Sequence, residues 1–170
     1  MCNVLIMTFG FFIMMNATNV LQNIAPTVIH DAGFGRLGFL ENGLMFCTFA
    51  FFSLAIASQL TYFGYKWTMV IGTFTYLIFT TCQLLCIEAH DNPGSDFWKS
   101  MTIPIWVLNL STAIFNGWGN ALLFVGSSTY VNACANDHNK GMYNAILWCG
   151  NTGSFITGNI IAAYVIPALS

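Results

Sequence analysis

The stretch CNVLIMTFGFFIMMNATNVLQNIA, residues 2–25, contains no Asp, Glu, Lys or Arg. A helix that crosses the roughly 30 Å hydrocarbon core of a bilayer needs about 20 apolar residues, and a charge at its centre costs on the order of 2.5–3.5 kcal/mol. The stretch therefore predicts a transmembrane helix over residues 3–25. The rest of the chain repeats the pattern, because its few charged residues fall into short windows between long uncharged runs.

The uncharged runs predict about five transmembrane segments. They cover residues 3–25, 37–60, 67–87, 103–133 and 142–167. The fourth run is longer than one crossing requires, and Gly126, Ser127 and Ser128 suggest a break within it. We therefore expect an all-α, polytopic transmembrane helix bundle that forms a single unit over residues 1–170.

A soluble globular domain is the alternative. The hydrophobic fraction of 56% is only modestly above the ordinary value of about 45–50%. However, ordinary soluble domains are about one quarter charged, whereas Asp, Glu, Lys and Arg make up 6% of this chain. So few ionised groups cannot keep the surface of a 170-residue protein solvated. Composition therefore favours a membrane protein.

Targeting and orientation signals are weak. Neither a cleavable signal peptide nor an Arg-rich transit peptide is visible, so we expect the first span to direct insertion or a leader to have been removed. Lys and Arg in short loops set orientation, but Arg36 and Lys99 fall on one side and Lys66 and Lys140 on the other. Charge does not decide the orientation. The host membrane is a plasma membrane, an endomembrane or an organellar inner membrane, and the sequence does not distinguish among them.

The cysteines and histidines do not predict a metal or catalytic site. Cys82 and Cys86 are four residues apart in an apolar run, without the Cys-x-x-Cys pairs or nearby histidine typical of a zinc site. Each of the three histidines lies beside an aspartate, but nothing supplies a nucleophile. We therefore expect no enzyme activity, no metal and no cofactor.

Amides within the predicted spans are more informative, because polar groups in lipid need partners and so face inward. The amides and hydroxyls at helical spacing are Asn16, Asn19 and Asn23; Asn109, Asn116, Asn120 and Ser127; and Asn144, Asn151 and Asn159. Such stripes line a hydrated cavity for a polar solute, or they form interhelical hydrogen bonds worth about 0.6–2 kcal/mol each. We favour the interhelical interpretation.

Small residues at four-residue steps predict close helix packing, since they let two backbones approach. The fifth span carries Gly150, Ser154, Gly158 and Ala162, and the fourth carries Ala113, Gly117 and Ala121. We expect these two spans to be each other's partners.

Glu41 is the ionisable residue nearest to the interior of a predicted span. Proton relays and ion-coupled pumps place such residues near the middle of the membrane, and the other ionisable residues lie outside the spans. We expect Glu41 to pair with Arg36 or with a neighbouring helix end. The chain does not look like a self-contained proton-coupled transporter.

Short motifs in a fixed order resemble the uncoordinated-ninety-three family of the major facilitator superfamily. They are FGFF at 9–12, LQN at 21–23, GFG at 33–35, FGYKWT at 63–68, GWGNA at 117–121, STYV at 128–131 and GNII at 158–161. Gly64, Lys66 and Trp67 form a degenerate version of the superfamily's loop motif. This version lacks the acidic and arginine residues with which transporting members hold their two halves together.

The resemblance implies the N-terminal half of a major facilitator, with Lys66 and Lys140 on the cytosolic or equivalent inner side. It also implies that the first, second, fourth and fifth helices surround a central cleft. The cleft-facing or interhelical positions are then Asn16, Asn19, Asn23, Asn116, Asn120 and Asn151.

Two functional hypotheses follow, because a major facilitator has about six helices in each of two halves and this chain ends after the fifth predicted span. One is an accessory or regulatory subunit of a larger membrane complex, since the family includes regulators of an ion channel and a trafficking chaperone. The other is the N-terminal portion of a split or fragmentary solute transporter. The expected partners are the lipid bilayer and other membrane subunits, with a polar solute in the second case and no nucleic acid in either.

Overall fold

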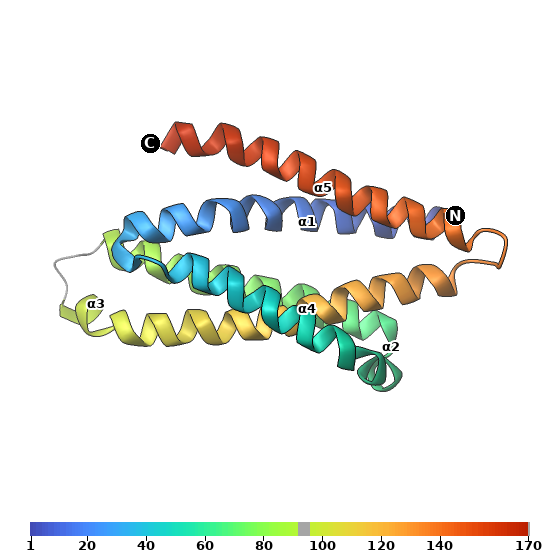
Figure 1. The fold of residues 1–170 in the computed structure, drawn as a ribbon, viewed down its shortest axis with the longest axis horizontal. Coiled ribbons are helices and arrows are strands. Elements are labelled where there is room, and N and C mark those ends of the chain that lie inside the picture. Colours follow the sequence, from blue (N-terminus) through green and yellow to red (C-terminus); the bar gives the residue numbers. More distant parts are fainter. Residues whose placement is uncertain (92–95, 170) are drawn as a thin grey trace. The chain divides into compact units, whose positions relative to one another are not determined.

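A computed structural model describes residues 1–91 and 96–169, which form helices joined by short turns. The elements in chain order are α1 (Cys2–Ile29), a π-helical turn η1 (His30–Phe34), α2 (Leu37–Asp91), α3 (Asp96–Ser100), α4 (Thr102–Ala133) and α5 (Lys140–Leu169) (Figure 1). No strand occurs in these two ranges. The all-α prediction is confirmed.

Helix α2 consists of two arms that meet at Gly64. The backbone of Gly64 has φ 68° and ψ 158°, a combination that glycine alone adopts without strain. Residues 37–63 form the first arm and residues 65–91 the second arm. The chain reverses direction between them, since Glu41 near the beginning of the first arm bonds Gln83 near the end of the second. The predicted loop motif thus lies at this turn, with Lys66 and Trp67 exposed in the first turn of the second arm.

Three segments are long and apolar enough to cross a membrane in the part of the chain that the structure describes. They are Cys2–Phe34, Leu37–Ile56 and Ser58–Asp91, at the positions of the first three predicted spans. Helices α4 and α5, of 32 and 30 residues, have sufficient length but are not among these three segments. That α4 and α5 also cross stays a prediction. The suggested break at Gly126 is wrong, because α4 continues without interruption to Ala133.

The chain forms two compact units. Unit 1 comprises residues 1–24 and 126–170, and unit 2 comprises residues 25–125. Each unit is described separately, and the single bundle over the whole chain stays a prediction.

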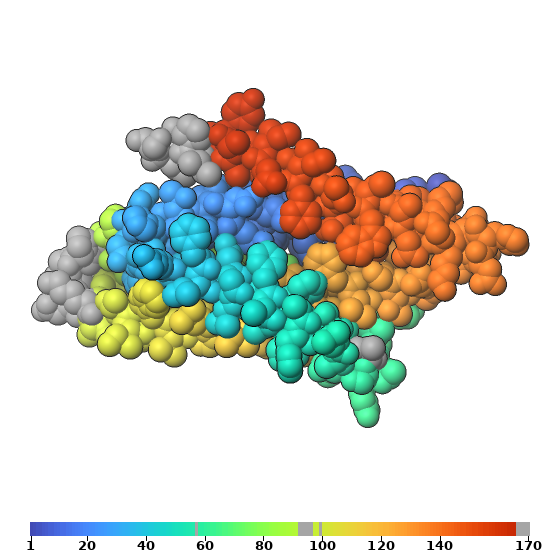
Figure 2. Space-filling view, in the orientation of Figure 1, coloured from blue at the N-terminus to red at the C-terminus, as the bar shows by residue number. Residues whose placement is uncertain are grey.

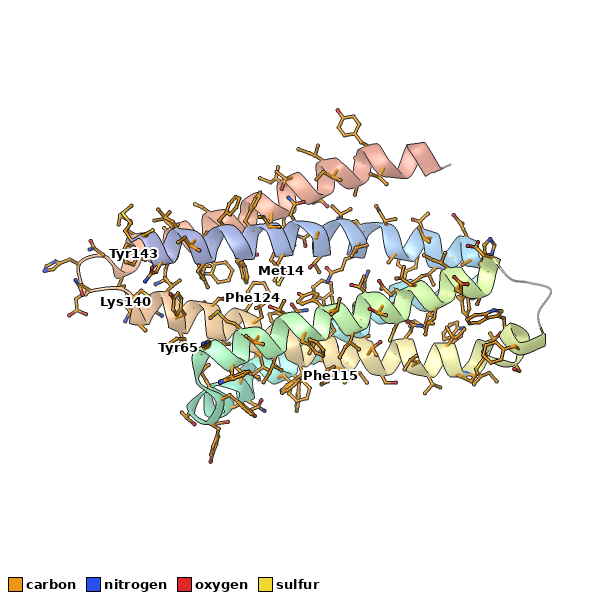
Figure 3. The ribbon with its side chains drawn as sticks, turned by 180° about the vertical axis from the view of Figure 1, so that it is seen from behind. Met14, Tyr65, Phe115, Phe124, Lys140 and Tyr143 are labelled. Carbon is orange, nitrogen blue, oxygen red and sulfur yellow. The ribbon has the colours of Figure 1, made fainter. Side chains whose placement is uncertain are left out.

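In unit 1, α1 and α5 lie side by side and run in the same direction. Thr8 of α1 lies against Gly150 of α5, and fifteen residues further along Asn23 bonds Asn159. Figure 3 shows the same arrangement from behind, with Lys140 and Tyr143 at the beginning of α5. The two helices are therefore in contact from the Thr8–Gly150 pair to the Asn23–Asn159 pair.

In unit 2, the two arms of α2 and helix α4 enclose the apolar core. Its buried clusters are Ile29, Phe34, Leu37, Cys86 and Ile105; then Met45, Phe79 and Ala113; then Ile56, Ala121 and Leu122. Glycines allow the close approach, since a Cβ on Gly72 would lie 2.7 Å from the Gly119 carbonyl oxygen. The outer side of the first arm carries exposed Phe39, Phe51 and Leu54, and Figure 2 draws the side chains of this arm in cyan.

Candidate functional site

Three asparagines of α1 form a ladder of hydrogen bonds with α5 in unit 1. Asn16 Nδ2 donates to Thr157 Oγ1. Asn19 Nδ2 donates to Ser154 Oγ at 3.4 Å, and Asn23 Nδ2 donates to Asn159 Oδ1 at 2.5 Å. The predicted stripe on α1 therefore faces a matching polar stripe on α5. Sequence reasoning found the α1 stripe and singled out Asn159 as an amide and Ser154 as a small residue, but it missed Thr157 and did not pair the two helices.

The small residues of α5 lie against α1 as well. A Cβ built on Gly150 would fall 2.5 Å from Thr8 Cγ2, and one on Gly158 would fall 3.0 Å from Asn19 Cβ. Ser154 and Ala162, which continue the stripe, are buried. The α5 stripe thus permits the close approach that the asparagine ladder requires.

The small stripes of α4 and α5 each pack against another helix of their own unit, and their expected pairing with each other stays a prediction. A Cβ on Gly117 of α4 would lie 2.5 Å from the Met45 carbonyl oxygen, in the first arm of α2. The stripe of α5 has α1 as its partner. The physical reason is that small residues permit close approach to any helix, whereas hydrogen bonds that must be satisfied in lipid select the partner.

The asparagines of α4 bond the arms of α2 in unit 2. Asn116 is fully buried; its Nδ2 contacts Met45 Sδ at 3.2 Å and its Oδ1 accepts from Thr75 Oγ1 at 3.3 Å. Asn120 Oδ1 accepts from the Tyr76 hydroxyl. Sequence reasoning missed Thr75 and Tyr76, although both are polar residues within an uncharged run and lie on one face of the second arm.

Trp118 adds a further polar contact between α4 and the first arm. Its Nε1 donates to Gln59 Oε1 at 3.0 Å. The indole N–H thus has a hydrogen-bond acceptor between α4 and the first arm. Gln59 also escaped sequence reasoning, which singled out asparagines only.

Glu41 is completely buried in the first arm. Its Oε2 accepts a hydrogen bond from Gln83 Nε2 of the second arm at 3.1 Å. The expected pairing with Arg36 is wrong, because no such ion pair occurs among the described side chains. Residues five apart do not share a helix face, unlike residues three or four apart. Glu41 does contact a neighbouring helical segment, through the side-chain amide of Gln83 near the end of the second arm.

Two buried amides keep an oxygen without a donor. Asn109 is fully buried; its Nδ2 donates to the Ile105 carbonyl at 2.9 Å and contacts Cys86 Sγ at 3.5 Å, while its Oδ1 has no hydrogen-bond partner. Asn151 Oδ1 in unit 1 is also without one. Asn151 is therefore the one residue of the predicted cleft set whose side-chain oxygen is buried and unsatisfied.

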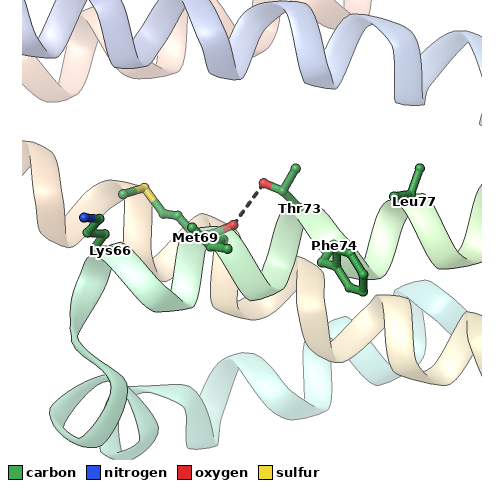
Figure 4. A pocket seen from close by; sticks show the side chains of 6 residues that line it. Lys66, Met69, Thr73, Phe74 and Leu77 are labelled. Atoms are coloured by element: carbon green, nitrogen blue, oxygen red, sulfur yellow. Dashed lines mark hydrogen bonds between the residues drawn. The ribbon is translucent and has the colours of Figure 1, made fainter.

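A groove follows the second arm next to Lys66 (Figure 4). Its volume is about 570 Å³, and its lining residues are Lys66, Met69, Val70, Thr73, Phe74 and Leu77. Thr73 Oγ1 donates to the Met69 carbonyl oxygen of its own helix at 2.9 Å. Apart from the Lys66 ammonium, the groove offers a polar solute few groups to bind.

The described residues contain no cluster of three or more His, Cys, Asp or Glu side chains that could hold a metal ion. His30 Nδ1 lies 3.4 Å from Asp31 Oδ1, and both side chains are largely exposed. All six cysteines are free thiols. These residues assemble no recognisable reaction centre in the described part of the chain.

Comparison with known proteins finds similarity to UNC93-like protein 3 of Arabidopsis thaliana. The two are 24% identical over 166 aligned residues, which cover 92% of this chain and 31% of that protein. No family model matches the chain, and no solved structure does. The predicted resemblance to the uncoordinated-ninety-three (UNC93) family is thus confirmed. The chain is a helical membrane protein that spans about a third of that relative's length.

Proposed function

We propose that this UNC93-like membrane protein is a non-enzymatic accessory or regulatory subunit of a larger membrane complex. The supporting observation is that the side-chain amides within its predicted spans form hydrogen bonds between helices. Asn16, Asn19 and Asn23 bond α5, while Asn116 and Asn120 bond the second arm of α2. Amides engaged in this way hold helices together and are not available to bind a solute.

The exposed apolar side chains agree with this role. Phe51, Leu54 and Trp67 are 71%, 86% and 61% exposed, and Tyr164 of α5 is 79% exposed. Such residues suit contact with lipid or with other membrane subunits, and aromatic residues are enriched where one side of a helix meets the membrane interface. The chain itself supplies a packing module within that assembly.

The alternative is the N-terminal portion of a solute transporter of the major facilitator type, split or fragmentary. The chain covers 31% of its UNC93-like relative, and facilitators bind solute near the midplane between two halves of about six helices each. Asn151 favours this alternative, since its buried Oδ1 has no donor and would suit a polar solute.

Native-gel analysis combined with crosslinking mass spectrometry tests the proposal. The chain is extracted in mild detergent from its own membrane, and its partners are identified by crosslinks. Co-migration with a multisubunit complex is the expected result. Co-migration with a chain that carries the remaining helices of a facilitator would favour the transporter alternative, and migration as a monomer would contradict both.

Substitution of the α4 amides gives a second test. Asn116→Leu and Asn120→Leu should lower stability and leave every solute flux of the host membrane unchanged. Ser111→Ala is the matched control, because Ser111 is exposed on α4 and bonds only the Val107 carbonyl oxygen of its own helix. Loss of a specific flux at normal stability would contradict the accessory role.

A further inference from the structure

Glu41 is a carboxylic acid enclosed on several sides by helices of unit 2. It lies in the first arm, completely buried, with Gln83 of the second arm as its hydrogen-bond donor. Cys82 and Cys86 of the second arm lie near it. Cys86 in turn contacts Asn109 of α4. The site is therefore formed by three helical segments that meet in the apolar core.

The site has more acceptors than donors. Glu41 Oε2 receives the Gln83 amide, but Glu41 Oε1 is buried with no hydrogen-bond partner. Asn109 Oδ1 is a second buried acceptor without a donor, while Asn109 Nδ2 donates to the Ile105 carbonyl and contacts Cys86 Sγ. A buried polar atom without a hydrogen-bond partner destabilises the fold, and more so when it is charged. A proton on Glu41 Oε1 removes one of these unsatisfied acceptors and the charge that burial penalises.

A negative charge is poorly supported at this position. A buried ionised group that lacks a partner costs several kcal/mol, and ionisable residues within membrane spans ordinarily pair or face water. No described basic side chain forms an ion pair with Glu41. The charged or titratable residues that the surrounding segments contribute include Arg36, Cys82, Cys86 and Glu88, and the pair His30 and Asp31.

We propose that Glu41 is a proton-binding site within the helical core. A proton taken from water binds Oε1 and converts this acceptor into a donor, while Oε2 keeps the hydrogen bond from Gln83. Release of the proton leaves a carboxylate that the single Gln83 amide stabilises. The ligand is the proton alone, and the inference does not depend on whether the chain is an accessory subunit or part of a transporter.

Infrared spectroscopy of the full chain in lipid nanodiscs tests the proposal at neutral pH. A protonated carboxylic acid has a carbonyl band that an ionised carboxylate lacks, and this band shifts in heavy water. The wild-type chain should show such a band, and Glu41→Gln should abolish it. Glu88→Gln is the matched control, because Glu88 is an exposed glutamate of the second arm, and it should leave the band unchanged.

A second variant keeps the test decisive if Glu41→Gln fails to insert. Gln83→Met retains the acid and removes the donor to Oε2, so the carbonyl band should move to higher frequency. Absence of a Glu41-dependent band in the wild-type chain, or a band that Gln83→Met does not move, would overturn the proposal.

Discussion

Gly158 of α5 lies so close to Asn19 of α1 that a Cβ on the glycine would fall 3.0 Å from the Asn19 Cβ. Asn19 reaches from this contact to the Ser154 hydroxyl, one turn earlier on α5. The close approach of the two backbones and the hydrogen bond between their side chains are thus parts of one contact. Gly158 therefore permits a close approach only to α1, and Asn19 finds its hydrogen-bond partner only on α5.

Gly158→Leu should disrupt the α1–α5 contact. The added side chain meets Asn19 Cβ and the Asn16 carbonyl oxygen, and overpacking of this kind costs about 1–3 kcal/mol. The apparent unfolding temperature in detergent should fall accordingly. Gly10→Leu is the control, because a Cβ at Gly10 of α1 meets nothing within 4 Å. Equal stability of the two variants would argue against the contact.

Thr157→Val should weaken the same pair of helices by removing the hydroxyl that accepts from Asn16. Interhelical hydrogen bonds in membranes contribute on average about 0.6 kcal/mol, with values up to about 2 kcal/mol. The matched control is Thr18→Val, since the Thr18 hydroxyl bonds only the Met14 carbonyl of its own helix. Denaturant unfolding in mixed micelles compares the two, and a larger loss for Thr18→Val would contradict the proposed ladder.

Gly64→Ala should destabilise the turn between the two arms of α2 through the backbone alone. A Cβ at Gly64 meets no atom within 4 Å, but the residue has φ 68° and ψ 158°. Residues other than glycine pay on the order of 1–3 kcal/mol in such a conformation. Gly141→Ala is the control, because Gly141 lies in α5, also with open space around it. Alanine there should be neutral or stabilising, so a similar loss in both would refute the strain argument.

Tyr76→Phe should lower the stability of unit 2, because it removes the hydroxyl that donates to Asn120 Oδ1. A buried acceptor left without a donor costs about 1–3 kcal/mol. Tyr62→Phe serves as the reference, since Tyr62 is 87% exposed and should tolerate the change. Thermal unfolding followed by tryptophan fluorescence measures both. If the two curves coincide, the Tyr76–Asn120 hydrogen bond contributes nothing to stability.

Charge and amide spacing predicted the helices because these signals are local. Segments without Asp, Glu, Lys or Arg correspond to helices throughout the described chain, and the stripe of Asn16, Asn19 and Asn23 does form one hydrogen-bonding face. The expected Arg36–Glu41 pair failed for a local reason too, since a separation of five residues places side chains on different faces. Periodicity therefore predicts which face of a helix is polar.

The sequence by itself predicted an all-helical membrane protein, since its long uncharged runs have the length of helices that satisfy their own backbone in lipid. Only the tertiary structure decided which helices are partners. It joined α5 to α1, Asn120 to Tyr76 and Glu41 to Gln83. The reason is that hydrophobicity distinguishes poorly between helix pairs within lipid, whereas close packing and complementary hydrogen bonds are properties of two surfaces together.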